Sequence, residues 1–150
     1  MEIRNRLLTM LAVAVICSAA TGTAHAFTAP EGDALIKHFL ASKKTPDLDP
    51  SEMGKALVDL NGDGKAELVL VWVQLGPTYF YNHLTVFVDE GRKYRTLTTP
   101  LTGEAKLLGV KGGVILIEQK TLGPKDPRCC PSVVKQVKFR WDGKKIQQLP

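Results

Sequence analysis

Turn signals recur about every ten residues along most of this chain, and this spacing restricts its fold more than any other feature of the sequence. Gly76-Pro77, Glu90-Gly91, Gly112-Gly113 and Asp142-Gly143 separate segments that are rich in β-branched and aromatic residues. Short turns of this kind join antiparallel strands, whereas parallel strands need long crossover connections. The sequence therefore predicts an antiparallel meander.

The segment 67–75 is the longest apolar run outside the N-terminus. Because it does not alternate with polar residues, we expect a central strand that is covered on both faces, with Trp72 in the core. Trp141 is expected in the core as well. The full set of predicted strands is 56–58, 67–75, 79–89, 93–98, 104–110, 113–121, 133–141 and 145–149.

The segment 30–44 differs from the rest because its apolar residues recur with a helical period. Acidic residues stand in its first turn and lysines in its last turn, as the helix dipole favours, and Pro46 prevents continuation. His38 is expected on the surface of this helix. The predicted fold class is α+β, mainly β, with an N-terminal helix followed by six to eight antiparallel strands in a curved sheet or partial barrel.

Residues 1–26 have the three parts of a secretory signal peptide: Arg4 and Arg6, an apolar run over 7–20, and a small-residue end at Ala24-His25-Ala26. The apolar run is too short to span a bilayer, so we expect cleavage after Ala26 and no membrane span in the mature chain. Cys17 raises the alternative of lipidation, but bulky Ile16 stands where lipoprotein signals place a small residue. We therefore predict one β-rich domain over 27–150, located in the periplasm or secreted.

The charged residues do not indicate a nucleic-acid-binding protein. The formal net charge is +5, with 20 Lys and Arg against 15 Asp and Glu. The basic residues are scattered among acids along the sequence rather than gathered in one block, which is typical of a solvated surface. The sequence does not identify a partner, and we consider another envelope protein as a candidate.

The stretch 59–67 carries oxygen-bearing side chains at alternate positions. Asp59, Asn61 and Asp63 supply three of them, Lys65 can offer its backbone carbonyl, and Glu67 adds a carboxylate. Calcium prefers six to eight oxygen ligands. The sequence therefore predicts these five residues as a calcium loop with a structural role, and no other cofactor.

Two observations limit this calcium prediction. Leu70 stands where an EF-hand places a bidentate Glu, and Asn-Gly and Asp-Gly also form hairpin turns without any ion. The spacing instead resembles the calcium loop of FG-GAP and VCBS-type β repeats, with Glu67 in place of the final Asp. Those families use several tandem copies, and this chain has one, so a propeller is not implied.

Cys129 and Cys130 are the cysteines of the predicted mature chain, and they lie in a proline-rich segment between two strands. A disulfide between adjacent cysteines is strained, because neighbouring Cα atoms are about 3.8 Å apart and ordinary disulfides prefer about 4.4–6.8 Å. We favour a vicinal disulfide that fixes the loop. The open alternatives are a redox-active pair, two buried thiols, and links to another chain.

The run Asp126-Pro127-x-Cys129-Cys130-Pro131-Ser132, followed by Arg140-Trp141-Asp142-Gly143, resembles the end of the LppP/LprE-like bacterial lipoproteins. The resemblance covers about residues 56 to 149. It implies an exported protein and carries no activity to this chain.

No set of residues with the spacing of a known catalytic motif is present. A nucleophile pair of His83 with Cys129 or Cys130 lacks any feature that would lower the pKa of the thiol. We therefore expect a non-enzymatic binding or structural module. The alternatives are a thiol-disulfide participant, and an inhibitor or adaptor of another envelope protein, which an exposed rim at 79–81 near the two cysteines would favour.

Overall fold

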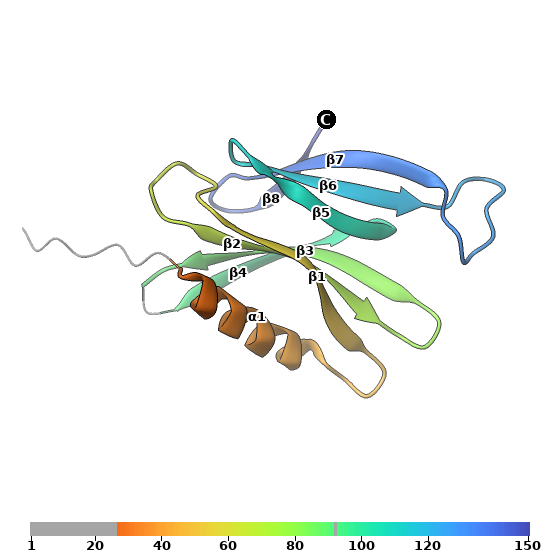
Figure 1. Ribbon diagram of the computed structural model, residues 1–150, viewed down its shortest axis with the longest axis horizontal. Helices are drawn as coiled ribbons and strands as arrows, with labels where there is room; N and C mark the ends of the chain where they lie inside the picture. Colours follow the sequence, from red (N-terminus) through yellow and green to blue (C-terminus); the bar gives the residue numbers. More distant parts are fainter. Residues whose placement is uncertain (1–26, 92) are drawn as a thin grey trace, which may run out of the picture.

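The helix and the two sheets of the protein lie in three layers, in the order helix, first sheet, second sheet (Figure 1). The computed structural model describes residues 27–91 and 93–150. Its elements are α1 (Ala29–Lys43), β1 (Asp49–Val58), β2 (Glu67–Leu75), β3 (Phe80–Asp89), β4 (Tyr94–Leu101), β5 (Glu104–Lys111), β6 (Val114–Thr121), β7 (Val133–Trp141) and β8 (Ile146–Leu149).

Each sheet is a four-stranded antiparallel meander, β1-β2-β3-β4 and β5-β6-β7-β8. The predicted class, the N-terminal helix and the antiparallel meander of up to eight strands are thus confirmed. The meander is divided, however: the chain leaves the first sheet after β4 and begins the second at β5, so the strands form two packed sheets and no closed barrel.

β2 is the central strand that its apolar run predicts. Val69 and Val71 are completely buried in the core between the two sheets. Leu70 and Trp72 point to the opposite face and pack under the helix. A strand covered on both faces cannot alternate with polar residues, which explains the unbroken run.

The helix is held on the first sheet by aromatic contacts. Phe39 meets Trp72 and Phe87 edge to face, with ring centroids 5.3 and 5.1 Å apart. Ile36 is 3% exposed beside them, whereas His38 is exposed to solvent as expected. Burying a large apolar side chain stabilises the fold by about 1.5–3 kcal/mol, so these contacts fix the helix to the sheet.

β1 begins earlier than predicted. The sequence indicated a proline-rich loop over 45–51, yet the strand starts at Asp49 and pairs Pro50 with Gln74. Proline cannot donate to a ladder, but it is tolerated on an edge strand, and β1 is an edge of the first sheet. The residues Asp49 to Glu52 therefore extend the first sheet toward one end of the sandwich.

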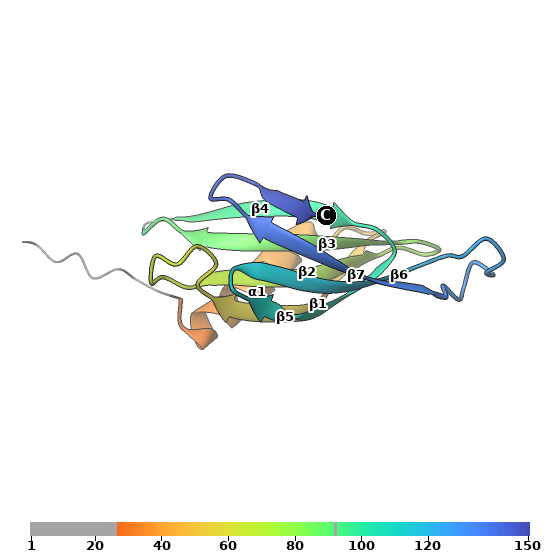
Figure 2. The same cartoon turned by 90° about the horizontal axis from the view of Figure 1, so that it is seen from above.

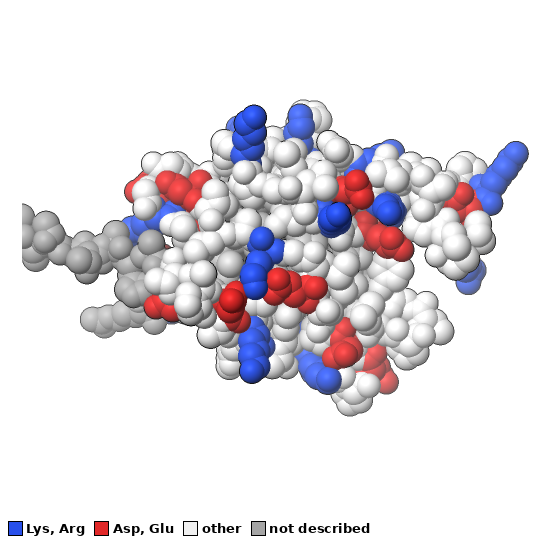
Figure 3. Space-filling model, in the orientation of Figure 1, with Lys and Arg blue, Asp and Glu red and all other residues white. Residues whose placement is uncertain are grey.

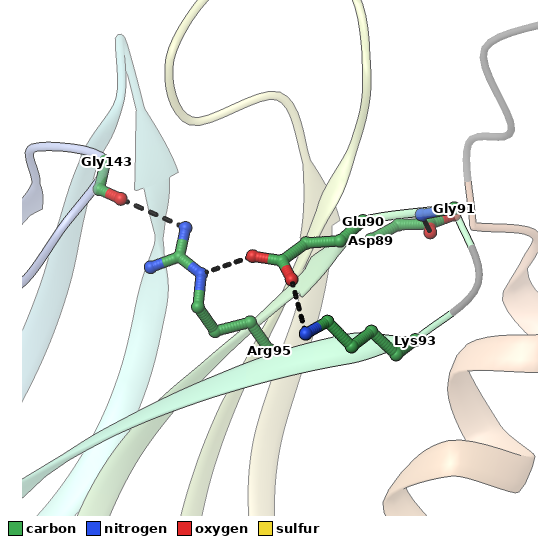
Figure 4. A network of polar contacts seen from close by, with 6 residues as sticks. All are labelled: Asp89, Glu90, Gly91, Lys93, Arg95 and Gly143. Atoms are coloured by element: carbon green, nitrogen blue, oxygen red, sulfur yellow. Dashed lines mark hydrogen bonds and ion pairs between the residues drawn. The ribbon is translucent and has the colours of Figure 1, made fainter.

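The opposite end of the sandwich is held by Arg95 of β4 (Figure 4). Its Nε donates to Oε1 of Glu90 over 2.7 Å, and its terminal nitrogen donates to the carbonyl of Gly143 over 3.0 Å. Gly143 lies in the turn between β7 and β8, so one side chain connects turns from both sheets. The other end carries the long loop between β6 and β7, which extends beyond both sheets in Figures 1 and 2.

Candidate functional site

The predicted calcium loop connects β1 to β2 and is ordered by its own side chains. Asp59 accepts hydrogen bonds from the backbone N–H of Asn61, Gly62 and Gly64, at 3.2, 2.6 and 2.8 Å. These bonds hold the pKa of Asp59 below its usual range. Asp63 accepts from the N–H of Lys65 over 2.8 Å. The loop is therefore built around its carboxylates.

Glu67 lies beneath this loop and is 3% exposed. Its Oε2 accepts a hydrogen bond from the N–H of Leu60 over 2.8 Å. Burial raises the pKa of Glu67, and the nearby charges of Asp63 and Asp59 raise it further, while the bond from Leu60 opposes the rise. The loop thus places a buried carboxyl group next to two exposed ones.

The structure brings the five predicted ligands into one turn, but it does not assign a metal to them. Among the described residues, no group of three or more His, Cys, Asp or Glu side chains has a geometry that could hold a metal ion. Two of the five predicted ligands are not of these residue types: the amide side chain of Asn61 and the backbone carbonyl of Lys65. Calcium binding therefore stays a prediction.

The loop between β6 and β7 is organised by Asp126. One carboxylate oxygen accepts from the N–H of Gly123 and of Ser132, both over 2.7 Å, and the other accepts from Oγ of Ser132 over 2.9 Å. These three bonds hold the pKa of Asp126 below its usual range. They fasten the two ends of the loop together, with the two cysteines between them.

Cys129 and Cys130 are both exposed and are free thiols in this structure. This arrangement excludes the two buried thiols that the sequence left open. The hydrogen bond with Cys129 raises the pKa of the Cys130 thiol, which is opposite to what a reactive nucleophile needs. The vicinal disulfide stays a prediction.

His83 does not form a catalytic pair with either cysteine. It lies on the helix side of the first sheet, where its ring stacks on Trp72 with centroids 4.4 Å apart. The loop with the cysteines belongs to the second sheet. Nε2 of His83 is buried without a hydrogen-bond partner, so the ring acts as a packing residue.

A cleft of about 390 Å³ opens at the end of the sandwich where the long loop leaves β6. Its wall combines apolar groups from both sheets with a few charged side chains. The residues that line it are Phe80, Thr102, Gly103, Glu104, Lys120, Thr121, Leu122, Arg128, Cys129 and Pro131.

At the base of this cleft the chain crosses from β4 of the first sheet to β5 of the second, and two features fix its conformation there. Nδ2 of Asn82, which is 3% exposed, donates to the carbonyl of Gly103 over 2.8 Å. Gly103 has a φ of +69°, and a side chain there would collide with the backbone of Lys120. A buried polar contact and a required glycine therefore hold the crossing point in one conformation.

A second cleft of about 250 Å³ adjoins the first and shares Phe80 and Glu104 with it. Large apolar side chains stand exposed around the two clefts, which is unusual for a surface that meets only water. They are Met53, Leu75, Phe80 and Leu122, with exposed fractions between 44% and 52%. We call this set the apolar rim.

The sequence indicated only part of this site. The sequence indicated the aromatic residues at 79–81 and the cysteine loop, but the position of Phe80 beside Cys129 depends on the crossover at Gly103. Glu104, Lys120 and Leu122 carried no motif that could have revealed them. A β-sandwich crossover is not encoded by any short pattern, so these residues become visible only in the fold.

The sequence profile described as LppP/LprE lipoprotein matches residues 61–144, which is more than half of the chain. The chain belongs to the LppP/LprE lipoprotein family. The matched segment begins inside the predicted calcium loop, after Asp59, and ends in the turn after β7. It therefore includes four of the five predicted ligands, the cysteine loop and all residues that line the first cleft. No curated protein and no solved structure matches.

Membership of this lipoprotein family indicates an exported, envelope-associated protein. Within the part of the chain that the structure describes, no helix is long and apolar enough to cross a membrane. The predicted signal peptide at 1–26, and with it Cys17, lies outside the described residues.

Proposed function

We propose that this family member is a non-catalytic binding module of the bacterial envelope, and that its cleft holds an apolar segment of another envelope protein. The observation that carries the proposal is the cleft with its apolar rim, because aromatic and aliphatic side chains around a pre-formed hollow are typical of recognition sites. Phe80 and Cys129 line the same cleft, which supports the adaptor interpretation in part, since Tyr79 and Tyr81 line neither cleft.

A photo-crosslinking residue placed at position 80 tests this proposal in the envelope of the native host. The matched control is position 94, since Phe80 and Tyr94 are both aromatic and both 44% exposed, but only Phe80 lines the cleft. We expect a discrete protein adduct from position 80 and none from position 94. No adduct at either position, or the same adducts at both, would contradict the proposal.

We also propose that calcium binds the loop of Asp59, Asn61, Asp63, Lys65 and Glu67 and stabilises the turn between β1 and β2. Two exposed carboxylates and the buried carboxyl of Glu67 gather in one turn, and a divalent cation would offset their mutual repulsion. This role is structural and supports the sheet from which the cleft is built.

Thermal melts of the purified protein in calcium and in chelator test this site. A ligand that binds only the native state raises its melting temperature, so we expect a rise of several degrees in calcium. The rise should disappear in Asp63→Ala and persist in Asp47→Ala, an exposed carboxylate outside the loop. Identical melts up to millimolar calcium would reduce the motif to a turn.

For the exported form, we propose cleavage after Ala26. Phe27 is 5% exposed and its ring stacks on Tyr94, with centroids 4.9 Å apart, so a mature chain that starts at this residue keeps the contact. N-terminal sequencing of the exported protein decides the question. A mature chain that starts at Phe27 is expected, and one that starts at a lipid-modified Cys17 would overturn it.

We further propose that Cys129 and Cys130 form a vicinal disulfide in the oxidising envelope and fix the wall of the cleft. Mass spectrometry of the unreduced exported protein should give a cysteine peptide lighter by two hydrogen atoms than the same peptide after reduction. Recovery of two free thiols would exclude the bridge.

A further inference from the structure

The two halves of the sandwich differ strongly in charge, although the sequence suggested scattered basic residues. Residues 104–150, which form the second sheet and its loops, contain ten Lys and Arg against four Asp and Glu. Residues 27–103 contain eight against ten. Folding therefore separates a basic sheet from a slightly acidic first sheet and helix.

Part of this charge gathers on the outer face of the second sheet. In the register of the strands, Lys111 on β5, Val114 on β6 and Arg140 on β7 stand side by side, and all point away from the core. Lys138 and Leu116 form the next row. Side chains of successive rows on one face are neighbours, so the three cations form one cluster.

These three cations are not held in ion pairs with acids of the described residues. Lys111, Lys138 and Arg140 are all exposed. The nearest acids are Glu118, in the row next to Lys138, and Asp142, in the turn after β7, which accepts a hydrogen bond from Gln147. Glu104 lies further along the sheet, at the cleft. In Figure 3, Lys and Arg side chains project from the top of the second sheet without an acidic side chain beside them.

Partly exposed aliphatic side chains lie among the cations. Val114 and Leu116 on β6 and Leu149 on β8 are half-buried on the same face. Lys144 and Lys145 extend the positive charge into the adjoining turn. Basic and aliphatic groups mixed over a flat face suit the interface of an anionic bilayer, where cations meet headgroups and aliphatic groups meet the acyl boundary.

We propose that the outer face of the second sheet docks on an anionic phospholipid surface through Lys111, Lys138 and Arg140. This face is separate from the cleft, since none of the three lines it, so the two proposals can fail independently. Docking on this face would leave the end with the cleft open to a partner.

Vesicle flotation tests the inference. Protein purified from the envelope of a bacterial host is mixed with vesicles of phosphatidylcholine alone, or of phosphatidylcholine with phosphatidylglycerol. We expect an excess of binding to the anionic vesicles that disappears in about 1 M salt, because screening shortens the range of surface charges. The triple variant Lys111→Gln, Lys138→Gln, Arg140→Gln should reduce this excess at least about tenfold.

The matched control is Lys37→Gln, Lys44→Gln, Lys93→Gln, which removes the same net charge from exposed positions on the helix, directly after it and in the turn before β4. This control variant should still bind the anionic vesicles in excess over the neutral ones. An equal loss in both variants would show that only net charge matters and would overturn the proposal. So would equal binding to both kinds of vesicle, or binding of soluble polyglutamate without binding of anionic vesicles, which would assign the face to an acidic polypeptide.

Discussion

At the residue scale, the two loops of the protein use carboxylates in the same way. Asp59 and Asp126 each accept several N–H groups of their own loop, and in both cases these bonds lower the pKa of the carboxyl group. Each loop has a fixed backbone because a charged acceptor satisfies donors that would otherwise face only water. The difference lies in their surroundings: one loop lies near the buried carboxyl of Glu67, and the other borders the cleft.

Replacing Asp126 with Asn should loosen the cysteine loop without unfolding the sandwich. The N–H groups of Gly123 and Ser132 lose a charged acceptor, so we expect their hydrogen exchange to accelerate about tenfold. Asp47→Asn, an exposed carboxylate on another loop, serves as the control. Unchanged exchange at both amides would mean that Asp126 does not hold the loop.

His83 should make the protein less stable in mild acid. Burial lowers the pKa of His83, and the nearby charge of Lys43 lowers it further, from an ordinary value of 6.5. The unfolded chain therefore binds the proton more readily, and stability falls as the pH drops below about 6.5. We expect the melting temperature to decrease by a few degrees between about pH 7.5 and pH 5.5, and to decrease less in His83→Phe.

The phenylalanine preserves an aromatic ring against Trp72 and removes only the titration. The matched substitution His38→Phe alters an exposed histidine on the helix and should leave the pH dependence as it is. If the melting temperatures of the unaltered protein and of His83→Phe depend equally on pH, groups other than His83 cause the loss of stability in acid.

At the element scale, the strands could be predicted from the sequence better than their grouping could. β2 and the turns at Gly112-Gly113 and Asp142-Gly143 are visible because an apolar run and turn residues are local signals. The division into two sheets is not visible, since it depends on the crossing at Gly103 and its bond with Asn82. The cleft was missed for the same reason.

The hairpin turn between β5 and β6 shows how one element fixes another. Gly113 has a φ of +72°, and a Cβ there would lie 2.5 Å from the carbonyl oxygen of Leu60, at the start of the predicted calcium loop. Gly112 also has a positive φ, of +57°, but nothing within 4 Å. The second sheet therefore packs directly on the loop of the first.

Gly113→Ala should cost more stability than Gly112→Ala. Both variants carry the backbone strain of about 1 kcal/mol that a side chain meets at positive φ, but only the first displaces Leu60. We expect an extra loss of about 1–3 kcal/mol in the free energy of unfolding, measured by chemical denaturation. Equal losses would show that the turn and the loop do not support each other.

At the scale of the whole molecule, the sandwich assigns different surfaces to different tasks. The helix covers one face of the first sheet, the outer face of the second sheet carries Lys111, Lys138 and Arg140, and one end carries the clefts and the apolar rim. The family profile spans β2 to β7 and the turn after β7, and so includes strands of both sheets. On this view the second sheet brings together the basic face, the cysteine loop and one wall of the cleft.

The most direct test of the binding proposal is the affinity of the purified protein for the partner captured at position 80. Leu122→Asp places a charge in the cleft, and Leu108→Asp places the same charge at a comparable exposure on β5, 52% against 42%. We expect Leu122→Asp to raise the Kd at least about tenfold and Leu108→Asp to change it little, because buried apolar contacts dominate such interfaces. Equal Kd values for Leu122→Asp and the unaltered protein would contradict the cleft as the binding site.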